Sequence, residues 1–281
     1  MSGATVIGAT ASRTGQRRTP MMRRRLLIGL ALLLTAGFML LPIAAVFGYA
    51  FAKGIGEWWT SIIQPDTVHA IQLTLLAALV SVPLNTAFGI CAAWSITKFR
   101  FRGRKLLITL IEIPFSISPI VAGVSYLMLY GAQGLIGGWL DDQGIQLMFA
   151  APGIILVTMF VTSPFVAREL IPLMQTQGSD EEEAAISLGA GGLFTFLKVT
   201  LPNIKWALLH GIVLCSARAV GEFGAVSVVS GHIRGQTNTL PLQIDLLYND
   251  YNATAAFAAA SILTLIALLT LVLKTWFEGH R

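Results

Sequence analysis

The sequence predicts an all-α integral membrane protein with six transmembrane helices and both termini on the cytoplasmic side. Three observations carry this prediction: only 12% of the 281 residues are charged, 55% are hydrophobic, and long apolar stretches follow one another along the chain. Soluble domains carry about twice this share of charged residues. The composition therefore excludes an ordinary soluble protein, a disordered chain and a disulfide-rich secreted domain.

Each apolar stretch reaches the roughly 20 residues that a helix needs to cross a bilayer. The first covers residues 26–52, which is too long for the apolar region of a signal peptide, so we interpret it as a retained span. Residues 1–25 are expected to form a disordered basic cytoplasmic tail, and residues 26–277 the transmembrane domain. The five later spans are expected at residues 68–96, 106–130, 152–173, 204–230 and 253–277.

The distribution of basic residues predicts the sidedness of these spans. With the N-terminus in the cytoplasm, 16 of the 19 Lys and Arg residues fall in or beside inside segments. The outside loops hold only Lys53 and Arg234, and Arg218 lies within a span. Cytoplasmic loops of membrane proteins carry an excess of Lys and Arg. The chain is therefore expected to be a multi-pass inner-membrane protein with both termini inside.

The sequence contains no pattern typical of a cofactor, a metal or a catalytic centre. Cys91 and Cys215 lie in apolar runs, and the four histidines have no ligand spacing, so no metal site is expected. No phosphate-binding loop is present, and the dinucleotide fingerprint that would begin at Gly189 fails at Phe194. We therefore expect no cofactor and no enzymatic activity on this chain, and any nucleotide chemistry must lie on another chain.

The most polar inside segment, residues 178–202, joins the fourth and fifth spans. Ser179 and Glu182 have the spacing of a capping box and predict the start of a helix. Gly189 is expected to end this helix in a left-handed conformation. A second short helix is expected from Phe194, before Pro202 at the junction with the fifth span. Local physics alone also fits a well-capped connection without further function.

The same segment resembles the signature loop of ABC-importer permeases. In that family Glu-Ala-Ala is followed by three residues, Gly, nine residues, Ile, any residue and Leu-Pro. The matching residues here are Glu183, Ala184, Ala185, Gly189, Val199, Leu201 and Pro202, with Val199 in the place of the isoleucine. The resemblance implies a type I ABC-importer permease fold. It also implies that these seven residues belong to helices that couple the permease to an ATPase.

Three later segments, residues 221–225, 230–235 and 239–242, resemble the oxyanion branch of these permeases. They are most similar to the W-type subunits of sulfate and thiosulfate importers, and a molybdate or tungstate permease is the alternative. The resemblance implies several partners: a dimer of ATP-binding subunits, a different second permease subunit of the T type, and a periplasmic sulfate- or thiosulfate-binding protein. Membrane lipid surrounds such a subunit, and no nucleic acid is expected to bind it.

Arg218 and Glu222 are the charged residues most clearly inside a span. Each costs about 2.5–3.5 kcal/mol at the centre of a membrane helix. Their i, i+4 spacing places them on one helix face, where they are expected to pair. Two interpretations stay open: a structural pair, which we favour for Glu222, and a contribution of Arg218 to an anion path. The two residues are therefore the candidates for a translocation path.

Two other classes of membrane protein were weighed against an importer permease. An ion-driven secondary transporter is expected to show internal repeats with interrupted helices at matching positions. No convincing repeat relates residues 26–130 to residues 152–277. A membrane-embedded enzyme needs a nucleophile with its base, paired acids or a metal cluster, and the predicted spans contain none of these. Both observations favour the permease.

Overall fold

The computed structural model describes residues 21–278, and every regular element in this range is a helix. The chain divides into two units, one ending at Ala45 and one beginning at Val46. Residues 1–20, and with them most of the basic tail expected over residues 1–25, lie outside the described range. Helix α1 (Met21–Ala50) begins five residues before the expected start of the first span. Its apolar part, Arg25–Ala50, is long enough to cross a membrane.

The described helices confirm a protein with five or six apolar spans. Four more helical segments besides the first are long and apolar enough to cross: Pro65–Lys98, Ala151–Gln177, Gly192–Val220 and Ala253–Trp276. The first of these is α3, and the second combines α7 (Ala151–Thr162) with α8 (Pro164–Gln177). The third ends with α11 (Leu201–Val220), and the fourth lies in α14 (Ala253–Glu278). A sixth span results when one bent helix pair is counted as a span.

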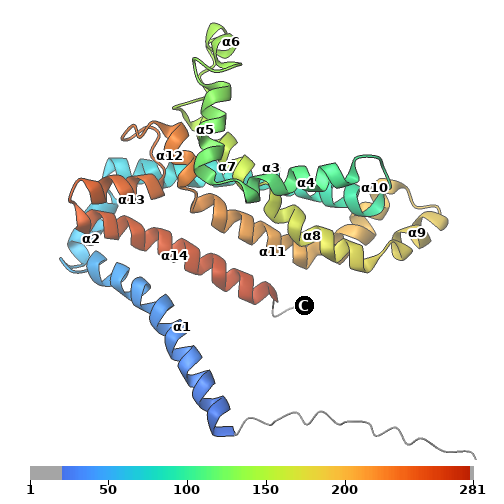
Figure 1. The fold of residues 1–281 in the computed structure, drawn as a ribbon, viewed down its shortest axis with the longest axis horizontal. Helices are drawn as coiled ribbons and strands as arrows, with labels where there is room; N and C mark the ends of the chain where they lie inside the picture. Colours follow the sequence, from blue (N-terminus) through green and yellow to red (C-terminus); the bar gives the residue numbers. More distant parts are fainter. Residues whose placement is uncertain (1–20, 279–281) are drawn as a thin grey trace, which may run out of the picture. The chain divides into compact units, whose positions relative to one another are not determined.

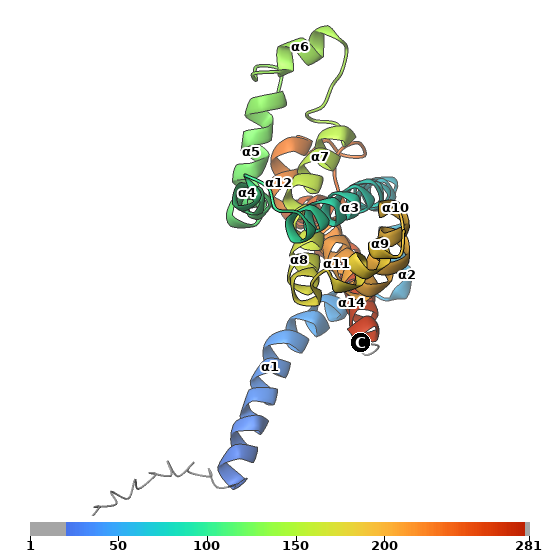
Figure 2. The ribbon, with the colours of Figure 1, turned by 90° about the vertical axis from the view of Figure 1, so that its right-hand side faces the viewer.

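That bent pair replaces the straight third span expected over residues 106–130. Helix α4 (Arg104–Ser116) and helix α5 (Pro119–Tyr130) meet at 107°. The bend arises because a proline ring disfavours helical backbone in the preceding residue, and Ser118 is accordingly extended at ψ 135°. Within the second unit, the short α6 (Gly137–Asp142) and the end of α5 that leads to it project away from the other helices (Figures 1 and 2).

The fifth span also ends ten residues earlier than the expected range of residues 204–230. Helix α11 ends at Val220, and a separate helix, α12 (Gly224–Ser230), follows after a break. Helix α12 packs against α5 so closely that a Cβ atom on Gly123 would lie 2.7 Å from the carbonyl oxygen of Ala225. The missing side chain therefore allows this contact, as small residues do at many membrane helix interfaces.

The core of the second unit forms where α3, α8 and α11 meet. Val166, Leu170 and Ile204 are fully buried there. A Cβ atom on Gly89 of α3 would lie 2.7 Å from the Cβ of Val166, so the glycine lets α8 approach the backbone of α3. This packing holds the two ends of α8 and α11 that flank the loop described below.

The two ends of the helices carry different elements. Helices α9 (Asp180–Ser187) and α10 (Gly192–Thr195) lie at one end, and α2 (Ile55–Ile62) and α13 (Leu240–Asn249) at the other (Figure 1). Helix α13 packs on α14 and α3, and its first backbone N–H donates to the hydroxyl of Thr74, with 2.7 Å between Leu240 N and Thr74 Oγ1.

Candidate functional site: the loop between α8 and α11

The loop folds as a helix–turn–helix, as the sequence predicts. Helix α9 carries four acidic residues in its first turn and has no buried residue. After the turn, α10 continues through a π-helical segment, η1 (Phe196–Thr200), directly into α11. The second helix begins at Gly192, two residues earlier than expected. The loop is therefore continuous with a membrane-spanning helix on its C-terminal side.

Gly189 ends α9 in the left-handed conformation that the sequence predicts. Its φ is +91°, and the following N–H of Ala190 donates to the carbonyl of Ala185 at 3.0 Å. No atom lies within 4 Å of the place that a Cβ atom would take. Glycine is therefore required here by backbone conformation, since a residue with a side chain rarely adopts this φ, and not by lack of space.

The capping box expected between Ser179 and Glu182 is wrong. The hydroxyl of Ser179 donates to Glu183 Oε1 at 2.6 Å instead of accepting a backbone N–H. Glu182 turns the other way, and its Oε1 lies 2.8 Å from the ammonium of Lys98. The Glu182 carboxylate is thus used in an ion pair with another helix, and the Ser179 side chain makes no cap hydrogen bond.

Lys98 is the partner that sequence reasoning missed. It is the last residue of α3, and its ammonium also donates to the carbonyl of Gly178, immediately before α9. We call Lys98, the Gly178 carbonyl and the Glu182 carboxylate the Lys98 clamp. The side chains of Lys98 and Glu182 are only 11% and 16% exposed. The sequence counted Lys98 solely as one of many basic residues at span ends, and no spacing signal links it to a residue 84 positions away.

Two further polar contacts tie α9 to the beginning of α11. The hydroxyl of Thr200 donates to Glu182 Oε1 at 3.1 Å, and the amide of Asn203 donates to the carboxylate of Glu181. Burial by itself raises the pKa of Glu182, but hydrogen bonds from Lys98, the backbone and Thr200, together with the Lys98 charge, lower it below its usual value overall. The carboxylate therefore stays ionised at neutral pH and keeps its ion pair with Lys98.

Aromatic packing fixes the second half of the loop to the same helix. Phe196 is the first residue of η1, and the centroid of its ring lies 5.1 Å from the ring centroid of Trp94 on α3. Trp94 also packs edge-to-face on Phe99, just beyond the end of α3. Single π-helical turns such as η1 occur frequently at functional sites. Both halves of the loop are thus attached to the last turns of α3.

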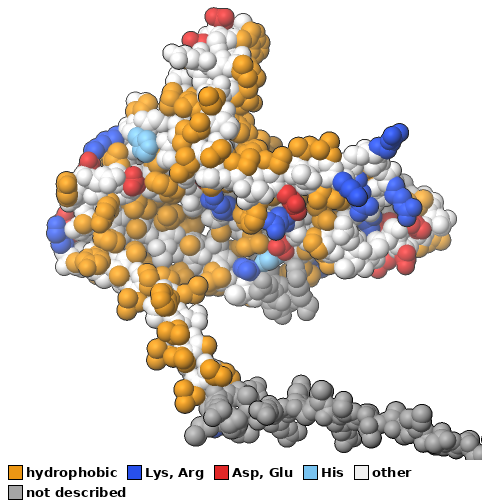
Figure 3. All heavy atoms as spheres, viewed as in Figure 1, with side chains coloured by type: hydrophobic (Ala, Val, Ile, Leu, Met, Phe, Trp, Pro, Cys, Tyr) orange, Lys and Arg blue, Asp and Glu red, His pale blue; other side chains and the backbone are white. Residues whose placement is uncertain are grey.

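The outer face of the loop is an exposed apolar surface beside the acidic turn. Its five large side chains, which we call the apolar face, are Ile186, Leu188, Leu193, Phe194 and Leu197. Leu188 is 90% exposed. Charged side chains gather around this end of the molecule (Figure 3). An exposed apolar patch rimmed by charge is typical of a protein interface.

The structure separates the predicted coupling residues into two groups. Glu183, Ala184, Gly189 and Pro202 are exposed, and Pro202 stands in the first turn of α11. Ala185, Val199 and Leu201 are half-buried, and Leu201 packs against the core between α3, α8 and α11. The first group is thus accessible to a partner, whereas the second is partly covered by the protein itself.

The predicted pairing of Arg218 and Glu222 is present at the opposite end of α11. Arg218 Nη1 lies 2.5 Å from Glu222 Oε2. Glu222 Oε1 accepts the backbone N–H of Ala225 at 2.9 Å, so the carboxylate also binds the first turn of α12. The Glu222 side chain is 1% exposed, whereas 31% of Arg218 is exposed. The pair lies at the break between α11 and α12, and not inside one long span.

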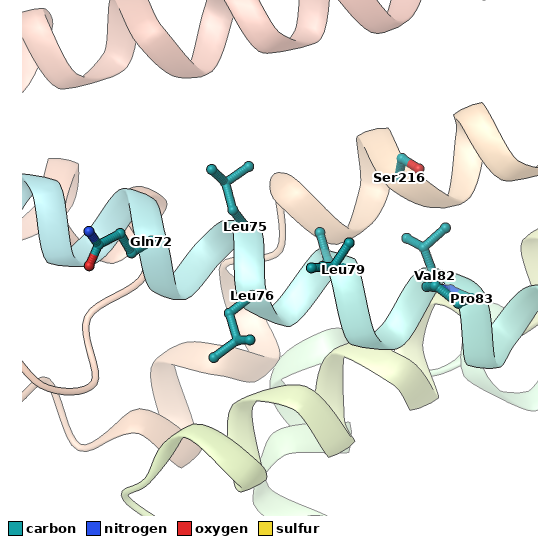
Figure 4. Close-up of a pocket in the computed structure, with 8 residues that line it drawn as sticks. Gln72, Leu75, Leu76, Leu79, Val82, Pro83 and Ser216 are labelled. Atoms are coloured by element: carbon teal, nitrogen blue, oxygen red, sulfur yellow. The ribbon is translucent and has the colours of Figure 1, made fainter.

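A groove of about 610 Å³ lies between α3 and α11. Its lining is almost entirely apolar, with Leu75, Leu79 and Val82 on α3 and the hydroxyl of Ser216 on α11 (Figure 4). No charged residue lines it. The groove therefore suits an apolar chain or helix and does not suit a bare oxyanion. Among the described residues, no group of three His, Cys, Asp or Glu side chains has the arrangement of a metal site.

Comparison with known proteins places these features in one family. The family described as binding-protein-dependent transport system inner membrane component matches residues 86–280. The chain is 56% identical to the sulfate transport system permease protein CysW of Escherichia coli K12, covering 90% of this chain and 87% of the relative. It is 50% identical to CysW of Synechocystis over 91% and 94% of the two chains.

More distant relatives and solved structures are also transport proteins. The chain is 35% identical to the sulfate transport system permease protein CysT of Escherichia coli K12, over 87% of this chain and 88% of the relative. A crystal structure of a bacterial ABC transporter involved in alginate import superposes with a TM-score of 0.73 at 18% identity, covering 92% of this chain and 96% of that one. A second alginate transporter, in complex with a periplasmic protein, has a TM-score of 0.72, also at 18% identity, over 92% and 94% of the two chains. These structures share the fold.

Proposed function

Because this chain belongs to the binding-protein-dependent transport system inner membrane components, we propose that it is the permease subunit of an ATP-driven importer for sulfate or thiosulfate. The identity of 50–56% to proteins named sulfate permeases, over about nine-tenths of the chain, supports the substrate class. It favours sulfate over molybdate or tungstate, the alternative that the sequence leaves open.

The geometry that carries this function is the loop of residues 178–202. An acidic helix and the apolar face project from the membrane-spanning helices, and the Gly189 turn holds them at a fixed angle. Such a surface fits a groove on an ATPase subunit: the apolar side chains lose water on docking, and Glu183 is exposed for a basic partner. ATP hydrolysis is then supplied by a dimer of these partners, since this chain has no phosphate-binding loop.

Similarity to CysT and to an alginate transporter supports two further partners, a second permease subunit and a periplasmic binding protein. CysT is also named a sulfate permease and is only 35% identical to this chain, which supports a different second permease subunit in a heterodimer. The alginate transporter that shares this fold was solved with a periplasmic protein, which supports delivery of the anion by a periplasmic sulfate- or thiosulfate-binding protein. We propose accordingly that the loop and both termini lie in the cytoplasm and α13 on the periplasmic side, as the excess of Lys and Arg on one side of the predicted spans supports.

The path for the anion is proposed to pass the Arg218–Glu222 pair and not the apolar groove. The groove has no charged lining, whereas Arg218 is partly exposed. Glu222 neutralises most of the Arg218 charge, so the site binds an anion weakly. Weak binding suits a transport path, because the ion must leave as readily as it enters.

The direct test is anion uptake in a strain that lacks this chain and is complemented with it. Sulfate and thiosulfate uptake are expected to return with the chain, and molybdate uptake is expected to stay unchanged. Restoration of molybdate uptake alone would select the alternative substrate class. Uptake that continues after the ATPase subunit is deleted would select an ion-driven transporter.

A second test addresses the docking surface. Leu188→Asp places a charge in the apolar face, and capture of the ATPase subunit by the purified permease is expected to fall at least tenfold. Tyr251→Asp is the matched control, because Tyr251 is 96% exposed next to α13, at the opposite end of the helices. Equal capture by both variants would contradict docking at the loop.

A further inference from the structure

We propose that Lys98 is a positioning residue that fastens the coupling loop to α3, so that α3 carries movement of the loop into the membrane-spanning part. This inference rests on the proposed function, since it assumes that an ATPase moves the loop. It adds a residue outside the signature of the loop, on a helix that the loop does not join in sequence.

Few contacts other than the Lys98 clamp hold α9. It has no buried residue, and its described side-chain contacts to Thr200 and Asn203 reach only the exit of the same loop. Lys98 alone among these partners belongs to a helix that the loop does not join in sequence. It binds both the Glu182 carboxylate inside α9 and the Gly178 carbonyl before it, so it restrains the beginning of the helix at two points.

The ion pair between Lys98 and Glu182 is largely covered by the protein, whereas the contact to the Gly178 carbonyl is exposed. The two side chains are 11% and 16% exposed, so solvent screens their attraction less than it screens a surface pair. Removing one member of such a pair leaves the other charge without compensation. The tilted contact between the rings of Phe196 and Trp94 adds an apolar contact one turn earlier on α3. The loop and the end of α3 are therefore expected to move together.

Helix α3 is long enough to link the loop to the opposite end of the helices. This helix has 34 residues and is therefore about 50 Å long. Near its middle, Asn85 donates to the carbonyl of Met159 at 3.0 Å and to the hydroxyl of Thr162 at 2.8 Å, just before the proline that separates α7 from α8. Toward its other end, Thr74 accepts the N–H of Leu240 in α13. One helix thus contacts the loop, the α7–α8 break and the opposite end.

The experiment uses the complete importer, with both permease subunits and the ATPase in proteoliposomes and the binding protein loaded with sulfate. The measured quantity is sulfate transported per ATP hydrolysed. Lys98→Glu is expected to lower this ratio at least tenfold while ATP hydrolysis continues. Lys98→Arg is expected to keep the wild-type ratio of transport to hydrolysis. The double variant, Lys98→Glu with Glu182→Lys, is expected to recover part of that ratio. Lys105→Glu, at an exposed residue in the same end region, is the control and is expected to have no effect.

The transport ratios of these variants either support or overturn the role of Lys98. An unchanged ratio in Lys98→Glu, or no recovery in the double variant, overturns the inference. If Lys98→Glu prevents assembly, Lys98→Gln takes its place, because it retains a donor for Gly178 but removes the charge; an unchanged ratio then overturns the inference. Failure of the wild-type importer to transport sulfate contradicts the proposed function instead, so the two failures are distinguishable.

Discussion

Arg218 and Glu222 join the last turn of α11 to the first turn of α12, with 2.5 Å between Nη1 and Oε2. The carboxylate uses its second oxygen to accept the Ala225 N–H. One acidic side chain therefore neutralises a cation and caps a short helix at a break in the fifth span. This double role explains how the chain tolerates a buried carboxylate at a place where an unpaired charge is costly.

Glu222→Ala is expected to destabilise the permease by about 2 kcal/mol. Loss of one partner of a buried ion pair costs about 3–5 kcal/mol, and the partial exposure of Arg218 reduces this cost. Glu222→Gln keeps the acceptor for Ala225 and is expected to cost about half as much. Thermal unfolding of the purified permease in detergent measures both. Equal losses in the two variants would show that the hydrogen bond to Ala225 contributes nothing, and an unchanged stability of Glu222→Gln would show that the charge contributes nothing.

The charge-swapped pair, Arg218→Glu with Glu222→Arg, separates structure from transport. If Arg218 supplies positive potential to the anion, the swapped protein stays folded and takes up sulfate at least tenfold more slowly. Full sulfate uptake by a folded swapped variant would rule out a path role for Arg218 and leave only the structural pair.

Asn85→Leu is expected to destabilise the α7–α8 region by about 1–2 kcal/mol. The amide supplies a hydrogen bond to the Met159 carbonyl at the helix break, and polar contacts of this kind between membrane helices are worth about that much. Thr86→Val is the matched control, because it removes only a local hydrogen bond to Val82 within α3. The thermal midpoints of the two variants in detergent check this prediction. An equal loss of stability in Thr86→Val and Asn85→Leu would contradict it.

Gly189→Val is expected to uncouple ATP hydrolysis from transport without removing the protein from the membrane. A side chain at φ +91° is strained by about 1–2 kcal/mol, and relief of that strain changes the angle of the docking surface. Gly191→Val is the control, since Gly191 has φ −70° and also has open space around it. Transport and ATPase rates of the assembled importer are the measurements. Normal transport by Gly189→Val would contradict the coupling role.

The stability that Glu182 contributes is expected to depend on pH. Its pKa is lower in the folded protein than in the unfolded chain, so the folded state is favoured by the ionised carboxylate above the unfolded pKa of about 4.3. This contribution is lost as the pH falls through the lower folded pKa. The thermal midpoint of the wild type is therefore expected to lie above that of Glu182→Gln at pH 7, and the difference to narrow as the pH falls below the unfolded pKa and through the lower folded pKa. A difference independent of pH would show that the carboxylate charge is irrelevant.

Much of the candidate site is readable from sequence because it depends on local backbone chemistry. The Gly189 turn, the acidic start of α9 and the i, i+4 pair of Arg218 and Glu222 each follow from residues a few positions apart. The capping box failed for the opposite reason. Glu182 had a local partner available in sequence, but its carboxylate pairs with a lysine 84 positions earlier.

The sequence by itself determined that the chain enters a membrane, roughly where its spans lie, and which loop carries the coupling signature. Hydropathy and short-range spacing are sufficient for these, since they act within one helix or one turn. Only the tertiary structure decided that the third span bends by 107°, that α12 separates from α11, and that the loop is fastened to α3 through Lys98. These features depend on which helices meet in space, and the side chains that meet are distant in sequence.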